Sequence, residues 1–82
     1  MFSSEKFGNW LCKSKGFGVR SAKDANSRLK RTKNFIDYEK YKEANLAIHA
    51  LEANNEYKNL SVFVQSQLKR ALTLYFQYSG LH

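Results

Sequence analysis

The chain has 82 residues, of which 43% are hydrophobic and 15% aromatic, and it carries a formal net charge of +7 at pH 7. This composition excludes wholesale disorder and predicts one domain, residues 1–82, with a thin but packable core. The lone cysteine, Cys12, excludes an internal disulfide and a cysteine-based zinc site. Without an apolar run of about 18 residues or a signal-peptide pattern, the chain is expected to be soluble, cytoplasmic and without a membrane partner.

The first half of the chain contains two segments with apolar residues at helical spacing. The first predicted helix spans Ser4–Lys15 and is followed by Gly16, a residue type that often ends a helix. The second spans Ala22–Ile36. Ser21 is a candidate N-terminal cap for it, because Asp24 follows three residues later and complements the helix dipole.

Two further helices are predicted in the second half, and no hairpin turn signal appears between alternating runs. Tyr41–Asn54 forms the third, and Glu56–Leu60 links it to the fourth, Val62–Ser79, which Ser61 caps. The predicted fold class is therefore all-α, a compact four-helix bundle. Its core is predicted to be built from large apolar residues on the four stripes: Phe7, Trp10, Leu11, Leu29, Ile36, Ile48, Leu51, Leu68, Leu72 and Tyr75.

The positive charge is concentrated along the chain. Between Lys13 and Lys33 lie eight of the fourteen Lys and Arg residues, with Asp24 as the sole acid. Residues 35–57 contain two bases and five acids, whereas residues 58–82 contain three bases and no acid. A basic field held on helices attracts polyanions, so the first and last thirds are expected to meet such a partner.

The polar faces opposite the apolar stripes of the second and fourth helices contain no acid. A solvating face usually mixes charge signs, so the second helix is typical of phosphate contact. Around the arginine of the fourth helix are short hydroxyl and amide side chains, which suit base edges and sugar-phosphate oxygens. An ordinary solvated surface is the alternative for both faces. The predicted DNA-binding residues are Lys23, Ser27, Lys30, Arg31, Asn34, Ser66, Lys69, Arg70, Thr73 and Gln77.

Catalytic and ligand-binding patterns are missing from the sequence. It has no Gly-rich phosphate loop, no nucleophile beside a base and no carboxylate pair in a plausible cleft. His49 lacks a Cys or carboxylate partner at ligand spacing. We therefore expect a non-enzyme that needs no cofactor, metal or small-molecule substrate.

A second class of function stays open, namely a protein-interaction module. The third predicted helix is acidic, and Leu74 and Phe76 lie off the core stripe of the fourth. Either the acidic helix or an exposed patch at Leu74 and Phe76 would then dock the partner.

Three segments of the chain form a familiar series: Phe7-Gly-Asn-Trp10-Leu11 with Lys15-Gly16-Phe17, Ser21-Ala22-Lys23-Asp24 with Ser27-Arg28-Leu29-Lys30-Arg31, and Ser66-Gln67-Leu68-Lys69-Arg70-Ala71-Leu72 with Tyr75. In order and spacing they resemble the N-terminal core-binding domain of tyrosine recombinases and phage integrases, a SAM-like helical domain. The resemblance spans nearly the whole chain through loose motifs.

This resemblance implies a SAM-like fold whose second and fourth helices face the major groove of double-stranded DNA. It also implies a role in DNA recombination as the non-catalytic domain. The catalytic Arg, His-x-x-Arg and Tyr set of the family lies in a downstream domain and has no counterpart here. The chain is then a freestanding module or a fragment joined to a catalytic domain. The acidic third helix departs from a DNA clamp and favours an additional protein partner.

Overall fold

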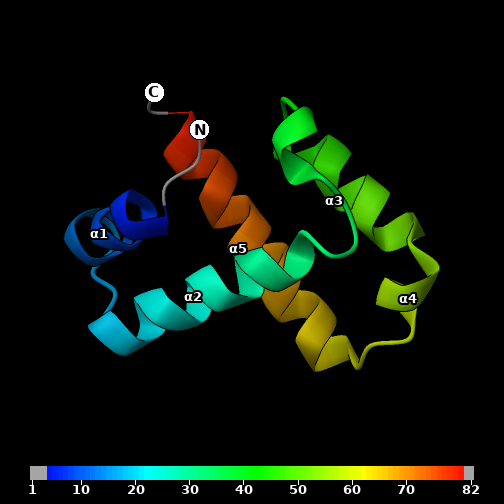
Figure 1. Ribbon diagram of the computed structural model, residues 1–82, viewed down its shortest axis with the longest axis horizontal. Helices are drawn as coiled ribbons and strands as arrows, with labels where there is room; N and C mark the ends of the chain where they lie inside the picture. Colours follow the sequence, from blue (N-terminus) through cyan, green and yellow to red (C-terminus); the bar gives the residue numbers. More distant parts are fainter. Residues whose placement is uncertain (1–3, 81–82) are drawn as a thin grey trace.

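The computed structural model describes residues 4–80, and this part of the chain contains helices joined by short loops and no strands (Figure 1). The all-α prediction is confirmed for these residues, although a one-turn helix and a short 3-10 helix join the four expected helices. The elements in chain order are α1 (Ser4–Ser14), α2 (Val19–Thr32), η1 (Tyr38–Lys40), α3 (Ala44–Ala53), α4 (Asn55–Lys58) and α5 (Val62–Ser79).

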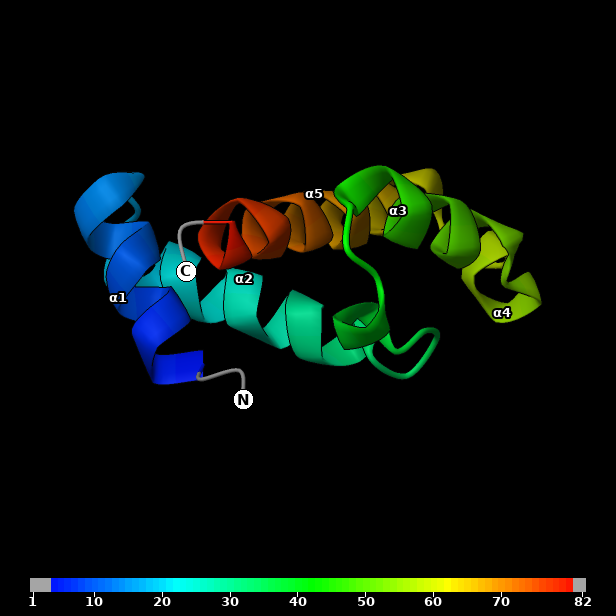
Figure 2. The ribbon, with the colours of Figure 1, turned by 90° about the horizontal axis from the view of Figure 1, so that it is seen from above.

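The long helices form two layers. Helix α2 crosses α5 in the neighbouring layer, and α3 lies beside α5 on the side away from α1 (Figures 1 and 2). Helix α1 packs against both α2 and α5. The molecule measures 35 × 25 × 17 Å, and its thinnest dimension suits two helices stacked at the usual spacing of about 8–10 Å. Each long helix therefore keeps one face toward solvent.

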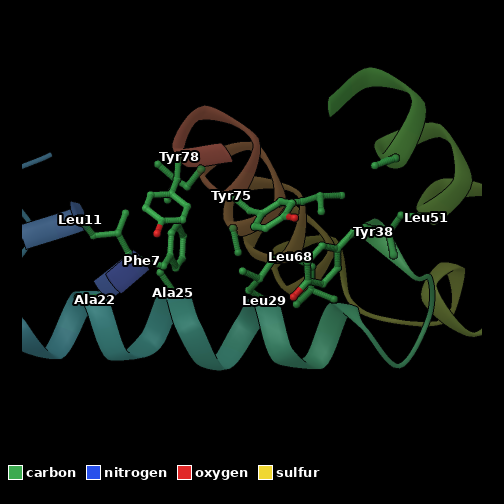
Figure 3. Close-up of a cluster of buried hydrophobic side chains, with 14 of the residues drawn as sticks. Phe7, Leu11, Ala22, Ala25, Leu29, Tyr38, Leu51, Leu68, Tyr75 and Tyr78 are labelled. Atoms are coloured by element: carbon green, nitrogen blue, oxygen red, sulfur yellow. The ribbon is translucent and has the colours of Figure 1, made fainter. Parts of the chain in front are cut away.

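The hydrophobic core lies between the two layers (Figure 3). The predicted core residues that are buried are Phe7, Leu11, Leu29, Leu51, Leu68, Leu72 and Tyr75. Trp10, Ile36 and Ile48 are half-buried and pack against this cluster from outside. The core also takes in tyrosines that the helical pattern did not single out, Tyr38, Tyr57 and Tyr78.

Tyrosines enter the core because their rings find aromatic neighbours and their hydroxyl groups find acceptors. The ring of Tyr38 packs edge-on against Tyr75, with centroids 4.7 Å apart. The hydroxyl of Tyr57 donates a hydrogen bond to the backbone oxygen of Gln65 over 3.0 Å. These contacts tie the segment between α2 and α5 to α5 itself.

The predicted cap of the second helix is wrong. Gly18 occupies the N-cap position with an extended backbone, and no side chain caps the helix. The amide of Ala22 donates to the backbone oxygen of Gly18 over 2.9 Å, so Ser21 already lies within the first turn. Gly16, with φ +69°, ends α1 in the left-handed conformation that its sequence position predicted.

Helix α2 also ends earlier than predicted, at Thr32 instead of Ile36. The amides of Asn34 and Phe35 donate to carbonyls three residues earlier, which tightens the last turn and releases the chain. The third helix begins at Ala44, after η1, whereas Tyr41 was predicted.

The predicted link at Glu56–Leu60 overlaps a one-turn helix, α4, which begins at Asn55. This turn is capped by Asn54, whose Oδ1 accepts a hydrogen bond from the amide of Tyr57 over 3.0 Å. The bounds predicted for the last helix and its cap are confirmed, since Ser61 Oγ accepts from the amide of Val64 over 3.2 Å. Within residues 4–80, no helix has the length and apolar character needed to cross a membrane.

Candidate nucleic-acid interface

The outward face of α2 is built as the helical pattern predicted. Ala22, Ala25, Leu29 and Thr32 are buried. Side chains about half a turn away from them must point to solvent. The five DNA-binding residues predicted for the second helix are all exposed: Lys23, Ser27, Lys30 and Arg31 lie on α2, and Asn34 lies two residues past its end.

The cations of α2 have no acidic partner among the described residues. Every ion pair in residues 4–80 involves a lysine outside α2, namely Lys33, Lys40 or Lys69. Asp24 lies one turn before Arg28, a spacing that allows an ion pair, but the two side chains do not form one. The positive charge of α2 is therefore not neutralised within this part of the chain.

The acids of residues 35–57, the middle segment, instead neutralise Lys33, which directly follows α2. Lys33 Nζ lies 3.3 Å from Asp37 Oδ1 and 2.7 Å from Glu39 Oε2. The hydrogen bond to Glu39 is the main reason that the pKa of Lys33 is raised. The ammonium group also lies 5.1 Å from the centre of the Tyr38 ring. Burial raises the pKa of that tyrosine to about 12.

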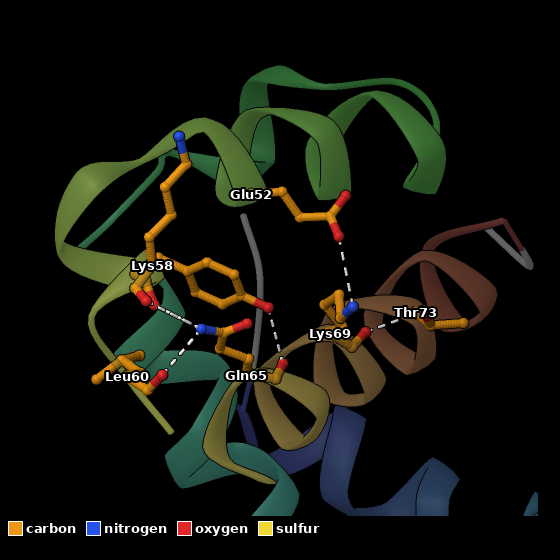
Figure 4. Close-up of polar contacts among 7 residues, drawn as sticks. Glu52, Lys58, Leu60, Gln65, Lys69 and Thr73 are labelled. Atoms are coloured by element: carbon orange, nitrogen blue, oxygen red, sulfur yellow. Dashed lines mark hydrogen bonds and ion pairs between the residues drawn. The ribbon is translucent and has the colours of Figure 1, made fainter. Parts of the chain in front are cut away.

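The side chains of two predicted DNA-binding residues of α5 bond to other groups of the protein (Figure 4). Lys69 Nζ pairs with Glu52 Oε2 of α3 over 3.4 Å. The hydroxyl of Thr73 donates to the backbone oxygen of Lys69 over 2.9 Å, so it is turned along the helix. The other three predicted residues of α5, Ser66, Arg70 and Gln77, are exposed.

The two predicted faces do not lie on one side of the molecule. The buried residues of α2 point toward α5 across the core (Figure 3), so the residues opposite them point away from α5. The fold does bring one edge of α2 next to one edge of α5. Arg28 and Gln67, half-buried, and Arg70, exposed, line one hollow between α2 and α5.

Sequence reasoning did not select Arg28 and Gln67 as site residues, because they flank the polar faces and do not lie at their centres. Their juxtaposition depends on how α2 crosses α5, and no spacing within either helix reveals it. Arg28 and Arg31 are neighbours on α2 by their i, i+3 spacing, so the hollow adjoins the basic face.

Neither surface predicted to dock a protein partner is present in the predicted form. Leu74 is 7% exposed and Phe76 packs half-buried against the core, so the predicted patch is wrong. Helix α3 contains Glu52 as its only acid, because most acids of the middle segment lie before or after it. The large apolar side chains most exposed on α5 are instead Val62 at 78% and Phe63 at 71%.

No group of three or more potential metal ligands occurs in the described residues. In comparisons with protein-family models, curated proteins and solved structures, none matches this chain. The similarity to the recombinase core-binding domain thus stays a prediction from sequence.

Proposed function

We propose that this chain is a non-catalytic module that binds double-stranded DNA through the basic face of α2. Lys23, Lys30 and Arg31 make the principal phosphate contacts, and Arg70 extends the surface at the edge of α5. Ser27 and Asn34 add hydrogen bonds to the backbone of the duplex. A SAM-like fold of the recombinase type, joined to a downstream catalytic domain or acting alone, remains part of this proposal.

The observation that carries the proposal is that the acidic side chains pair with some of the cations and not with those of α2. The carboxylates of the middle segment pair with Lys33, Lys40 and Lys69, whereas no carboxylate pairs with a cation of α2 in the described residues. Each unpaired cation can displace a counterion from a phosphate, which is the main source of affinity in sequence-tolerant DNA binding. A straight duplex fits one such face better than two faces that point apart.

The test is the affinity for a short blunt duplex, measured by fluorescence anisotropy over a range of salt concentrations. The logarithm of the affinity should fall with a slope of about −0.9 for each phosphate contacted. Lys30→Glu with Arg31→Glu should lower affinity by at least about a hundredfold while the melting temperature stays nearly unchanged, because exposed charges contribute little to stability.

A matched control is Lys40→Glu with Lys42→Glu, which changes the net charge equally but within the acidic segment, residues 35–57. Both lysines are exposed and lie outside α2. This control should reduce affinity only through the long-range field. Equal losses for the two double variants would contradict the assignment to α2, and no detectable binding at low salt would contradict the function.

The second candidate function is docking of a protein partner, and the exposed pair Val62 and Phe63 favours it. Adjacent apolar side chains at the start of a helix form a small hydrophobic surface that water solvates poorly. Replacing both with Ser should leave duplex affinity unchanged if this surface serves a separate partner. A loss of duplex binding in that variant would show that Val62 and Phe63 belong to the same binding site as the basic face of α2.

A further inference from the structure

The hollow between the α1–α2 loop, residues 21–28 of α2 and the middle of α5 has a volume of about 490 Å³. This falls within the roughly 300–1,000 Å³ of small-molecule sites and exceeds what a single phosphate needs. Two arginines from different helices, Arg28 and Arg70, line it together. Both guanidinium groups would attract an anion bound between them, and each can hold it by more than one hydrogen bond.

The polar side chains of this hollow are not used inside the protein. Within residues 4–80, the side chains of Asp24, Arg28, Gln67 and Arg70 make no hydrogen bond or ion pair. Gln65, two residues before Gln67 on α5, behaves differently. Its Nε2 donates to the backbone oxygens of Lys58 and Leu60 over 3.3 and 2.9 Å (Figure 4).

Apolar groups complete the lining and suit a flat ring. Phe17 is half-buried in the loop before α2, and Leu74 is 7% exposed on α5. An aromatic ring beside arginines is the combination on which proteins stack unpaired bases while they contact the adjoining phosphate. The amide of Gln67 can both donate to and accept from the edge of a base.

We propose that this hollow binds one unpaired nucleotide of the DNA held by α2. Arg28 and Arg70 contact its phosphate, Phe17 stacks on its base, and Gln67 and Asp24 bond to the base edge. The proposal rests on the proposed function, since Arg28 adjoins the basic face through Arg31. It adds a preference for duplexes that carry an unpaired nucleotide over fully paired ones.

Asp24 makes the proposal more specific. Its carboxylate repels phosphate and accepts hydrogen bonds only, so it favours a base with an amino group, such as cytosine with its N4 amino group. Asp24 and Arg28 lie one turn apart on α2, so the base and the phosphate meet different parts of the hollow. Thymine has no amino group and is expected to bind less well.

The experiment compares a short blunt duplex with the same duplex carrying one unpaired dC at its end, by fluorescence anisotropy at fixed salt. The unpaired dC should raise affinity about tenfold, since stacking of a base and an added phosphate contact both contribute. Replacing that dC with dT should reduce the gain, and Asp24→Asn should remove the difference between the two bases.

Gln67→Ala and Phe17→Ala should abolish the gain and leave blunt-duplex affinity unchanged. Asn45→Ala, an amide truncation on the exposed surface of α3, is the matched control and should preserve the gain. Circular dichroism confirms that each variant is folded.

The outcomes separate the two proposals. Equal affinity of the wild-type protein for both duplexes overturns the nucleotide site and leaves duplex binding standing. A gain that survives in both Gln67→Ala and Phe17→Ala also overturns it, because the preference then arises elsewhere. Failure to bind either duplex overturns the proposed function as well.

Free dCMP distinguishes the two sources of a nucleotide. It should compete with the unpaired end only at concentrations far above those of the oligonucleotide, because the duplex adds the contacts of α2. Tighter binding of dCMP than of the oligonucleotide would overturn the assignment to a nucleic-acid strand.

Discussion

Helices α2 and α5 share one sequence pattern, an apolar stripe opposite polar side chains, but they differ in what surrounds them. Helix α2 packs against α1 and α5, whereas α5 packs against α1, α2 and α3. The acid that approaches α5 comes from α3, where Glu52 pairs with Lys69. Within residues 4–80, no acid pairs with the cations along α2. A polar helical face is therefore available to a partner only when no other element supplies its counter-charges.

The largest expected effect is on the free energy of unfolding, and it compares a core residue of α5 with an outward residue of α2. Leu72→Ala in α5 should lower the free energy of unfolding by about 2–5 kcal/mol, because Leu72 is fully buried and its removal leaves a cavity. Lys30→Ala on the outward face of α2 should change it by less than about 0.5 kcal/mol. Urea denaturation measures both, and similar costs would contradict the roles given to the two helices.

The next test compares neighbours on α5. Arg70→Ala should weaken duplex binding about tenfold and reduce the salt slope by about 0.9, because one phosphate contact is lost. Lys69→Ala should change affinity by less than about twofold, since Glu52 already holds that ammonium group. If Lys69→Ala proved the more damaging variant, the place given to Arg70 on the binding surface would be wrong.

Two serines compare the starts of the helices. Ser61→Ala should destabilise the domain by about 1 kcal/mol, because the amide of Val64 loses its acceptor. Ser21→Ala should have almost no effect on stability, since Ser21 lies inside the first turn of α2 and caps nothing. Thermal melts of the two variants give the comparison directly. A marked loss of stability with Ser21→Ala would restore the cap that its sequence position predicted.

The smallest effect at neutral pH concerns Tyr38, which lies where the end of α2 meets α5. Its pKa is raised from 10.0 to about 12 in the folded protein. The unfolded chain therefore loses this proton first, so stability is unaffected below pH 10 and falls as pH rises from there toward 12. The raised pKa of Lys33 acts in the same direction.

Tyr38→Phe should make the alkaline loss of stability smaller, as measured by urea denaturation at a series of pH values. The nearby half-buried Tyr41 offers the matched substitution, and Tyr41→Phe should leave the loss in place. An unchanged pH dependence in Tyr38→Phe would show that other groups cause it.

Local features explain which parts of the fold the sequence predicted well. The last helix has both predicted ends and its Ser61 cap, because the acceptor for the first amides of the helix comes from the residue that directly precedes it. The second helix starts at Val19 instead of Ala22, since Gly18 provides an extended entry and no side-chain cap is needed. The helical pattern also overlooked Tyr38 and Tyr57, whose burial depends on partners supplied by α5.

The sequence by itself determined that the chain is helical, that α2 carries basic residues opposite its apolar stripe, and that Lys30 and Arg31 point outward. These properties follow from the 3.6-residue period and the order of side chains. Only the tertiary structure decided which cations are neutralised, that Leu74 is buried, and that Arg28 and Arg70 share one hollow. Such contacts join residues far apart in the chain, so they depend on how α2, α3 and α5 pack together.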